Sequence, residues 1–441
     1  MKINMSLGLG KCSGKNAKLL FMLILWYMLA AILMGFFHFP KAIVYIGDLL
    51  NIYIFICALH RDGNKGLIVS AKSPFLWMLI FICVGIAGSI INLESPIHIL
   101  WGLRQNARFF LFFYSCITFL KKEDLNILLG IVRVVFWISL PLTILEAMFW
   151  VEVTSYEVIV GDLVGGIYFN IGNGVNAALN TILIIHCTDV VLKYFNKEKK
   201  LIELIAVIGA GITMAAMAEM KIFFVQIVII VFIAMILNKI SLKTILLVVL
   251  GIIALIGAAI LFVKINARGR VYYTLDYISL SGFLQNISRD SGYVGTGDFN
   301  RFGAVPGVFN RIFSGDIAQS LFGVGLGNAD YSQGFEFLQG PYYKAYGDLH
   351  YQWFMTSFVF IETGIFGLLS YFLIYISAMF RRKRLVAGSF FRNFYTIMVV
   401  MMLILIIYNP CLRNEQCAFI LFMILALPEL SDKYENFLRG K

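Results

Sequence analysis

The stretch HYQWFMTSFVFIETGIFGLLSYFLIYISAMFRRKR, residues 350–384, contains the features that decide how this chain folds. His350 precedes a long apolar run, and a basic cluster, Arg381 to Arg384, follows it. About twenty apolar residues suffice to cross the hydrocarbon layer of a bilayer, so the run predicts a membrane-spanning helix over 351–376. Lys and Arg accumulate on the cytoplasmic side of membrane proteins, which places the basic cluster inside and His350 outside.

The composition of the whole chain agrees with this interpretation. The 441 residues are 60% apolar and only 14% charged, with a mean hydropathy of +0.85. Such a composition predicts an all-α polytopic membrane protein. The net charge of +11 could indicate nucleic-acid binding, but the basic clusters, such as 193–200 and 381–384, fall on segments expected in the cytoplasm. This charge therefore orients the protein, and no nucleic-acid partner is expected.

The apolar runs predict about twelve transmembrane helices with both termini in the cytoplasm. Their expected ranges are 19–37, 42–59, 75–92, 97–120, 126–150, 171–192, 201–218, 222–238, 243–263, 351–376, 394–409 and 416–429. The first run lacks a clear cleavage site of small residues and is expected to be a retained span. The chain thus divides into helices 1–9 (1–263), one large external loop or cap (264–349), and helices 10–12 with a cytoplasmic tail (350–441).

The connection 264–349 is much longer than the other connections and is rich in Phe, Tyr and Gly. Loops of this length are usually functional or fold as small caps, and this one is too aromatic for a disordered linker. The chain has seven cysteines, none of them in this loop. Neither a disulfide framework nor a metal site is therefore expected.

Two arginines inside the fourth predicted span are candidate binding residues. Arg104 and Arg108 lie four residues apart in WGLRQNARFF and project from one helical face. Two guanidinium groups near the outer leaflet suit a phosphate or pyrophosphate, because arginine donates bidentate hydrogen bonds. The equally weighted alternative is internal pairing with acids such as Asp48, Glu146 or Glu362.

Further cations lie at the short turn 219–221 and in the long loop. Glu219 and Lys221 separate two apolar runs, which can both cross the membrane only if the turn between them is tight. Lys221 could hold an anionic head group, or it could simply mark the turn. The arginines of the long loop are Arg268, Arg270, Arg289, Arg301 and Arg311. Most of them are expected to be solvated or paired. The stretch LFGVGLGN (321–328) lacks the lysine and the βαβ context of a phosphate-binding loop, so no such loop is predicted.

His350 is a candidate general base, because imidazole titrates near neutral pH and this one lies where the external loop meets a predicted span. A capping or packing role is the alternative. Glu362 lies about 18 Å further along a continuous helix, which is too far to orient His350. We expect Glu362, with Gly364 and Gly367, to serve intramembrane packing and pairing.

Three stretches together resemble the family of bacterial O-antigen ligases and O-unit polymerases. His350, followed after twelve residues by IETGIFGLL, is similar to the histidine and Glu-x-Gly-hydrophobic-x-Gly span of that family. Arg301 with the downstream GVGLG resembles the family's loop arginine and glycine motif. GGIYFNIGNGVNAALNTIL (165–183) is similar to a glycine-rich entry to a middle span. Where many relatives have Ser-Arg at the short hairpin, this chain has Glu219-Met-Lys221.

The resemblance implies an inverting, metal-independent membrane glycosyltransferase without a cofactor, acting on the external or periplasmic face of the bacterial cytoplasmic membrane. The donor would be an oligosaccharide linked to undecaprenyl pyrophosphate, and the product a surface polysaccharide such as O-antigen, capsule or exopolysaccharide. It implies His350 as the base for the acceptor hydroxyl and Arg301 as the cation that stabilises the leaving pyrophosphate. The supporting pyrophosphate-binding candidates are Lys221, Arg104, Arg108 and Arg311. Tyr342, Tyr343 and Tyr346 could stack on sugars, although packing within the cap is expected for most of them.

Three functions remain open at this point. A polymerase of lipid-linked repeat units is preferred, with a chain-length regulator and a flippase as possible partners. A ligase that moves the glycan to lipid A-core or to protein would have the same residues. A glycan transporter or flippase would use Arg104, Arg108, Arg133 and Glu362 as a path, but it leaves the large loop and His350 unexplained.

Overall fold

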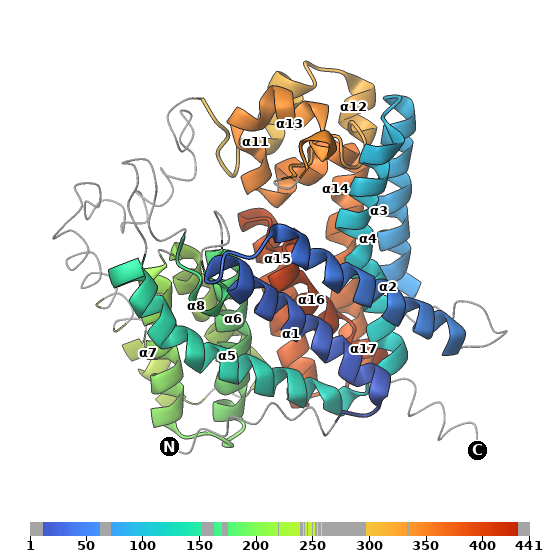
Figure 1. The fold of residues 1–441 in the computed structure, drawn as a ribbon. Helices are drawn as coiled ribbons and strands as arrows, with labels where there is room; N and C mark the ends of the chain where they lie inside the picture. The colour runs from blue at the N-terminus through green and yellow to red at the C-terminus, as the bar shows by residue number, and fades with distance from the viewer. Residues whose placement is uncertain are drawn as a thin grey trace.

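The computed structural model describes residues 12–61, 72–150, 163–169, 175–218, 220–238, 297–332 and 335–430, with isolated positions between 241 and 257. Within these residues the chain forms helices and turns, with no strand among them (Figure 1). The predicted helix 243–263, Glu219 and the loop arginines Arg268, Arg270 and Arg289 lie partly or wholly outside the described residues.

Each long helix that was predicted within the described residues is present, with ends shifted by a few residues. The helices are α1 (Lys15–Gly35), α2 (Val44–Arg61), α3 (Lys72–Ile91), α4 (Pro96–Phe119), α5 (Leu125–Leu145), α6 (Asn176–Phe195), α7 (Leu201–Met217), α8 (Lys221–Leu237), α14 (Met355–Arg381), α15 (Phe390–Tyr408), α16 (Glu415–Leu425) and α17 (Leu427–Leu430). A five-residue π-helix, Glu146–Trp150, continues α5.

Seven helical segments in the described part of the chain are long and apolar enough to cross a membrane. They are Lys15–Gly35, Lys41–His60, Pro74–Ile91, Lys122–Phe149, Asn176–Phe195, Met355–Arg384 and Phe390–Tyr408, and α7, α8 and α16 are shorter apolar helices. The protein is therefore an all-helical polytopic membrane protein. The total of twelve spans stays a prediction.

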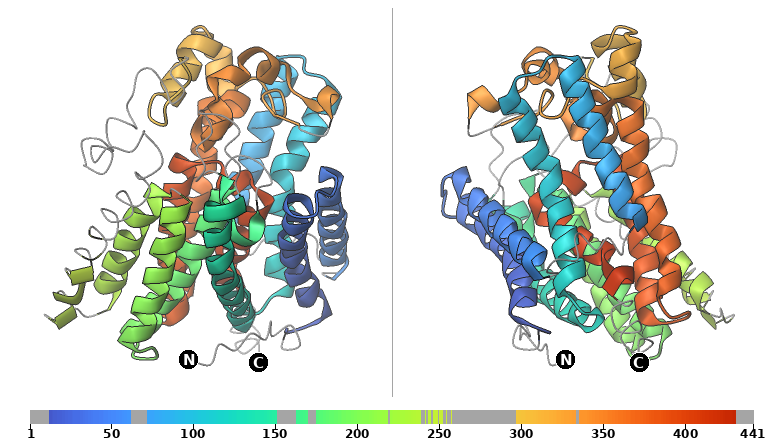
Figure 2. Two further views of the ribbon diagram at one scale, coloured as in Figure 1. Left: turned by 60° about the vertical axis from the view of Figure 1, so that its left-hand side comes forward. Right: turned by 90° about the vertical axis from the view of Figure 1, so that its right-hand side faces the viewer.

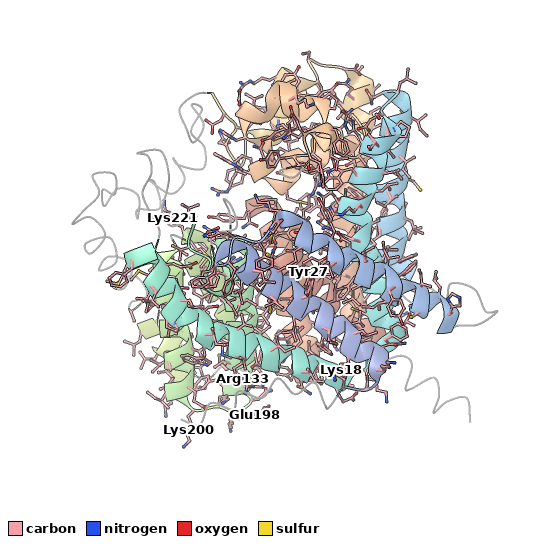
Figure 3. The ribbon with its side chains drawn as sticks, in the orientation of Figure 1. Lys18, Tyr27, Arg133, Glu198, Lys200 and Lys221 are labelled. Carbon is pink, nitrogen blue, oxygen red and sulfur yellow. The ribbon has the colours of Figure 1, made fainter. Side chains whose placement is uncertain are left out.

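The described part of the long loop forms a small helical cap at one end of the bundle. It contains α11 (Ala304–Gly307), a π-turn (Val308–Ile312), α12 (Ile317–Phe322) and α13 (Pro341–Tyr346), joined by short turns. Figures 1 and 2 show α3, α4 and α14 reaching from the bundle up to this cap. Figure 3 shows Lys18, Arg133, Glu198 and Lys200 near the opposite end of the bundle.

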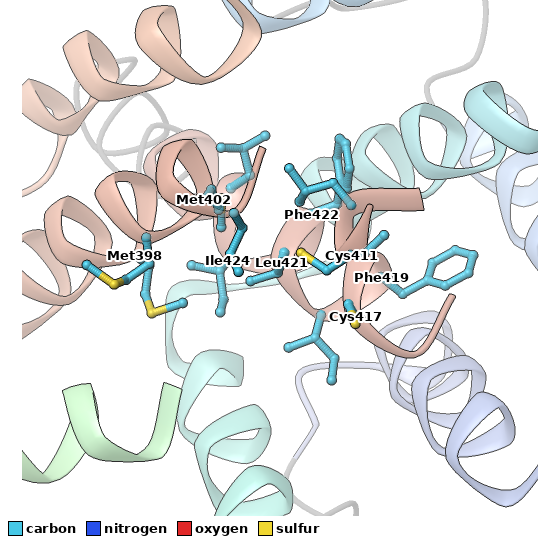
Figure 4. Packing of buried hydrophobic residues seen from close by; sticks show 14 of the residues in the cluster. Met398, Met402, Cys411, Cys417, Phe419, Leu421, Phe422 and Ile424 are labelled. Atoms are coloured by element: carbon cyan, nitrogen blue, oxygen red, sulfur yellow. The ribbon is translucent and has the colours of Figure 1, made fainter. Parts of the chain in front are cut away.

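The core of the bundle is built around the short helix α16. Its residues from Gln416 to Leu425 are all buried, as expected for a helix that is apolar on every side. Phe419 stacks on Tyr27 of α1 with ring centroids 4.7 Å apart, and it contacts Phe112 of α4 at 4.9 Å. Figure 4 shows Met398 and Met402 of α15 in the same cluster of buried side chains. The central position of α16 fixes α1, α4 and α15 around it.

Helix α14 differs from the continuous helix that was predicted from residue 351. It begins at Met355, because residues 347–349 and 351–353 form two 3-10 turns with His350 between them in the left-handed conformation, at φ 54°. Helix rise therefore cannot give the separation of His350 from Glu362. The helix is also interrupted at Gly364, whose φ of 61° and ψ of −164° lie in a region that essentially only glycine adopts.

Candidate functional site

The interruption in α14 receives the glycine-rich segment 323–327 of the cap. Val324 N–H donates to the carbonyl of Ile361 at 2.8 Å, and Gly325 N–H donates to the carbonyl of Glu362 at 3.0 Å. The next two amides bind side chains: Leu326 N–H donates to Ser89 Oγ at 3.0 Å, and Gly327 N–H to Glu362 Oε1 at 2.7 Å. These four amide groups already have partners within the protein, so the segment holds the cap to the bundle and does not cradle a phosphate.

Glycine is required in this segment because it passes very close to three helices. Gly323, Gly325 and Gly327 have φ of 74°, 104° and 87°, which disfavour other residues. An added Cβ would collide with α14 at Gly323, with α3 at Gly325 and with α4 at Gly327. The glycine motif of the cap and the Glu-x-Gly motif of α14 therefore pack directly against each other.

Glu362 lies beside Arg413, which joins α14 to the cap. Arg413 Nη1 is 3.6 Å from Glu362 Oε2, and its Nη2 is 3.4 Å from Asp330 Oδ2. The guanidinium also lies 3.5 Å from the centroid of the Phe358 ring. The prediction that Glu362 serves buried pairing is confirmed. Sequence analysis missed Arg413; the available signal was an arginine in the short connection between the last two predicted spans.

Arg104 and Arg108 are paired with buried acids. Arg104 donates to Asp48 Oδ2 through Nε, at 2.9 Å, and through Nη2. Arg108, whose side chain is 5% exposed, donates to Glu415 Oε1 at 2.6 Å and lies 3.7 Å from Asp48 Oδ1. Of the two interpretations open for this pair, the structure has internal pairing, with Asp48 as predicted and with Glu415 in addition.

Arg301 lies in the cap and reaches the outer end of α15. Its Nε donates to the carbonyl of Tyr408 at 3.0 Å, and its guanidinium lies 4.2 Å from the centroid of the Tyr408 ring. It also lies 5.7 Å from the centroid of Phe354, at the start of α14. Arg301 therefore brings a guanidinium group to the junction of cap and bundle.

His350 lies at the same junction. Its imidazole stacks on Trp353 with ring centroids 4.0 Å apart and an interplanar angle of 4°. Its Nδ1 is buried and has no hydrogen-bond partner among the described residues. The left-handed backbone at His350 and the stacking on Trp353 hold the ring in one orientation. A positioned imidazole can accept a proton from a group that reaches one of its ring nitrogens.

A backbone hydrogen bond brings the segments of Arg301 and His350 together. Phe299 N–H donates to the carbonyl of Leu349 at 3.0 Å, so the residues just before Arg301 lie against the residue before His350. Arg311 joins this group, since its Nη1 donates to the carbonyl of Gly297 and its guanidinium lies 5.2 Å from the Phe299 ring. The segments that carry three of the predicted site residues thus meet where the cap joins α14.

Lys221 is the first residue of α8, just after the tight turn that the sequence predicts there. Its side chain is exposed, and Figure 3 places it closer to the cap than Lys200 and Glu198, which lie at the other end. Helix α8 packs against α15, the helix that ends at Tyr408 beside Arg301. The predicted approach of Lys221 to Arg301 stays a prediction.

The three tyrosines proposed to stack on sugars mainly contact the cap itself. Tyr343 packs on Tyr331 with ring centroids 4.7 Å apart, and Tyr342 lies 5.9 Å from Tyr346. The hydroxyl of Tyr342 accepts a hydrogen bond from Gln319 Nε2 at 3.1 Å. Packing within the cap, the alternative that the sequence favoured for most of these rings, accounts for these contacts.

The junction of cap and α14 therefore combines an imidazole, from His350, with the guanidinium group of Arg301. The described residues contain no group of three or more His, Cys, Asp or Glu that could hold a metal ion.

A scan against models of known protein families finds no match, and a search of curated proteins finds no significant relative.

Proposed function

We propose that this protein is a membrane glycosyltransferase that polymerises lipid-linked oligosaccharide repeat units. The observation that supports this most directly is the hydrogen bond from Phe299 to Leu349, which brings the segments of Arg301 and His350 together. A base and a cation at the boundary between a membrane bundle and an external cap suit a donor whose lipid lies in the membrane and whose glycan lies outside it. The resemblance of the motifs around these residues supplies the substrate class.

In the proposed reaction, an acceptor sugar hydroxyl attacks the anomeric carbon of the donor glycan. His350 takes the proton of that hydroxyl, and its orientation by Trp353 supports this role. The bond between the anomeric carbon and the pyrophosphate oxygen breaks, and undecaprenyl pyrophosphate leaves with the electron pair. Attack from the face opposite the leaving group inverts the anomeric centre.

We assign stabilisation of the leaving pyrophosphate to Arg301, with Lys221 and Arg311 as supporting cations. Positive groups already in place where negative charge develops lower the barrier, because the protein does not have to reorganise during the reaction. Arg104 and Arg108, which were expected to share this role, are held by Asp48 and Glu415. We assign them instead to holding α2, α4 and α16 together.

The two alternative functions, ligase and transporter, agree with the structure to different degrees. A ligase would need the same base and cation, and it differs only in the acceptor. A transporter or flippase would use Arg104, Arg108 and Glu362 along a path, but these side chains pair with acids or with Arg413. We therefore prefer glycosyl transfer to transport, and within glycosyl transfer we prefer the polymerase to the ligase.

The test measures polymer length in membranes from the native host, with the chromosomal gene deleted and the chain supplied in variants. His350→Ala should lower polymerisation about 10²–10⁴-fold, the usual contribution of a general base. His350→Asn should do the same, and because Asn tolerates the left-handed conformation, it separates lost chemistry from backbone strain. Arg301→Lys should also impair transfer, since a point charge does not replace a planar guanidinium.

His38→Asn is the matched control, because His38 is an exposed histidine that also has a positive φ, of 56°. It should polymerise normally. All variants are compared at equal membrane content, measured by immunoblot. Near-normal polymer from both His350 variants would refute the assignment of the base.

A further inference from the structure

A pocket of about 330 Å³ lies between the α3–α4 turn and the cap. It is lined by Asn92, Leu93, Glu94, Ser95, His98, Asn328, Pro341 and Tyr342. Its volume is in the range of pockets that bind small molecules. None of these residues belongs to the group at Arg301 and His350.

The walls of the pocket are fixed by hydrogen bonds between distant parts of the chain. Asn92 Nδ2 donates to the carbonyl of Gly323 at 3.0 Å and so holds the end of α3 to the cap. On the cap side, Tyr342 N–H donates to the carbonyl of Asn328 at 3.1 Å, and Gly340 N–H to the carbonyl of Asp330 at 3.0 Å. The pocket is therefore preformed.

Glu94 is the most unusual group in this pocket. Its side chain is 2% exposed, yet neither carboxyl oxygen accepts a hydrogen bond within normal geometry from the described residues. The Ser89 hydroxyl lies nearby, but it donates to the carbonyl of Gly85, at 3.1 Å. The nearest ionisable group is His98, whose Nδ1 is 3.9 Å from Glu94 Oε1. A buried polar group without a partner costs stability, so an unpartnered carboxyl group lining a pocket points to a ligand.

The side-chain amides of Asn328 and Asn92 also leave mainly hydrogen-bond acceptors for a ligand, because their donor groups are already used. Asn328 Oδ1 is buried without a partner, while its Nδ2 is already bonded to the carbonyl of Val324 at 2.9 Å. The Nδ2 of Asn92 is likewise used, by the carbonyls of Gly88 and Gly323. The pocket thus offers at least three free acceptor oxygens, two from Glu94 and one from Asn328. It calls for a ligand rich in hydrogen-bond donors.

The choice among donor-rich ligands follows from charge, size and the apolar wall. An anion is disfavoured by the carboxyl group of Glu94. A metal ion would fill only a small part of about 330 Å³, and the described residues hold no group of three His, Cys, Asp or Glu for it. Pro341 and the half-buried Tyr342 add an apolar surface beside the acceptors. A sugar ring combines several hydroxyl donors with an apolar face.

We propose that this pocket binds a neutral saccharide unit, with Glu94 and Asn328 accepting hydrogen bonds from its hydroxyl groups and Tyr342 lying beside its apolar face. The choice of a saccharide over other neutral polyols rests on the proposed function. In that context the pocket holds part of the glycan away from the reacting bond. It would contribute to selecting which repeat unit is used.

The test uses the full chain in lipid nanodiscs and saturation-transfer difference NMR, which detects weak binding without turnover. The probes are glucose, galactose, N-acetylglucosamine and rhamnose, with glucosamine as a charged comparison and Mg²⁺ added as a competitor. At least one neutral sugar should bind. Measured at about pH 9, where the Glu94 carboxyl group is ionised, Glu94→Gln should weaken its binding about 10-fold or more, because a hydrogen bond to a charged group is among the stronger ones.

Tyr342→Ala provides a second, independent variant, because its ring is only half-buried and its loss should leave the fold intact. Two matched controls lie in the cap outside the pocket lining: Tyr346→Ala, whose ring neighbours Tyr342, and Asp348→Asn, whose carboxyl group is exposed. Both should bind the sugar like the unmodified protein. Melting temperature and elution volume show which variants fold. If Glu94→Gln does not fold, the binding measured with Tyr342→Ala decides the test.

The proposal is overturned if no neutral sugar binds, if only glucosamine binds, if Mg²⁺ displaces the sugar, or if neither pocket variant weakens binding. The His350→Ala protein separates this proposal from the proposed function. It should bind the sugar normally and fail to polymerise. Sugar binding that depends on Glu94, in a protein whose polymerisation is unaffected by the His350 variants, would support the pocket and refute the assigned base.

Discussion

At the scale of single residues, the structure separates side chains that hold the fold together from those that remain available for chemistry. Arg108 is buried and paired with Glu415 and Asp48, whereas His350 has a buried nitrogen without a partner in the described part of the chain. The sequence could predict that an arginine within a span needs a partner, because an isolated charge in hydrocarbon is costly. It could not predict Glu415, since that contact depends on how α4 packs against α16.

The Glu94 carboxyl group leads to a prediction about pH and stability. Burial raises its pKa from 4.5 to about 8, although the nearby Ser89 hydroxyl acts to lower it; the titratable groups near it include His98 and Glu362. Between about pH 4.5 and pH 8 the folded state then binds more protons at this site than the unfolded state. The free energy of unfolding should therefore fall as pH rises through this window.

Thermal unfolding of the protein in nanodiscs from pH 5 to pH 9 measures this effect. Glu94→Gln removes the titrating group, so its melting temperature should fall less with rising pH than that of the unmodified protein. Glu336→Gln, at an exposed carboxyl group of the cap, is the control and should keep the original profile. Identical profiles for the unmodified protein and Glu94→Gln would show that this carboxyl group is not desolvated.

At the scale of elements, the central feature is the interruption of α14 at Gly364 and the cap segment that binds there. The length of the apolar run predicted the helix, although its start lies at Met355 and not at residue 351. It did not predict the interruption, since a glycine within an apolar run is compatible with an unbroken helix. The interruption is needed only because α12 lies against it, as an added Cβ at Gly364 would collide with the Leu321 backbone.

Gly364→Ala tests this feature. Alanine at φ 61° and ψ −164° is strained by about 1–3 kcal/mol, and the collision with Leu321 adds to that cost. We expect a large loss of folded protein, measured by yield and by melting temperature. Gly130→Ala, on α5 with nothing within 4 Å of the added Cβ, is the control. It should be neutral or slightly stabilising, because alanine favours helices over glycine.

Arg413 supplies a second prediction at this scale, because it joins the α15–α16 turn, α14 and the cap. Arg413→Met would leave Glu362 and Asp330 without their cation, which typically costs about 3–5 kcal/mol for a buried pair. Adding Glu362→Gln should recover part of that loss. A double-mutant cycle on unfolding free energy measures the coupling, with Arg311→Met at an exposed arginine as the control. Strictly additive losses would exclude the link between Arg413 and Glu362.

At the scale of the whole molecule, the cap and the basic clusters lie at opposite ends of the bundle (Figure 3). The charge pattern of the sequence predicted which ends of the helices share a side, because Lys and Arg in short connections mark that side whatever the packing. The length and the aromatic content of the connection 264–349 predicted a folded cap. They did not predict that the cap would bind α3 and α4, since segments more than 200 residues apart meet there, as Asn92 and Gly323 do.

Reporter fusions test the orientation of the molecule. A reporter inserted at the exposed start of α12, after Asp316, should be active only on the external side of the membrane. A reporter after Lys197, in the turn between α6 and α7, should be active only in the cytoplasm. The reverse result at the cap would invert the topology and remove the proposed chemistry from the external face.

The binding of segment 323–327 between α3, α4 and α14 has a consequence for biogenesis. The two earlier helices leave the ribosome long before this segment, and α14 leaves it afterwards, so the segment has only part of its binding site while it is being translated. Ile361 and Glu362, which accept its amide hydrogens, arrive last. The cap can therefore reach its final structure only after α14 has been made, and a nascent chain stalled before Met355 would carry an incomplete cap that is open to proteolysis.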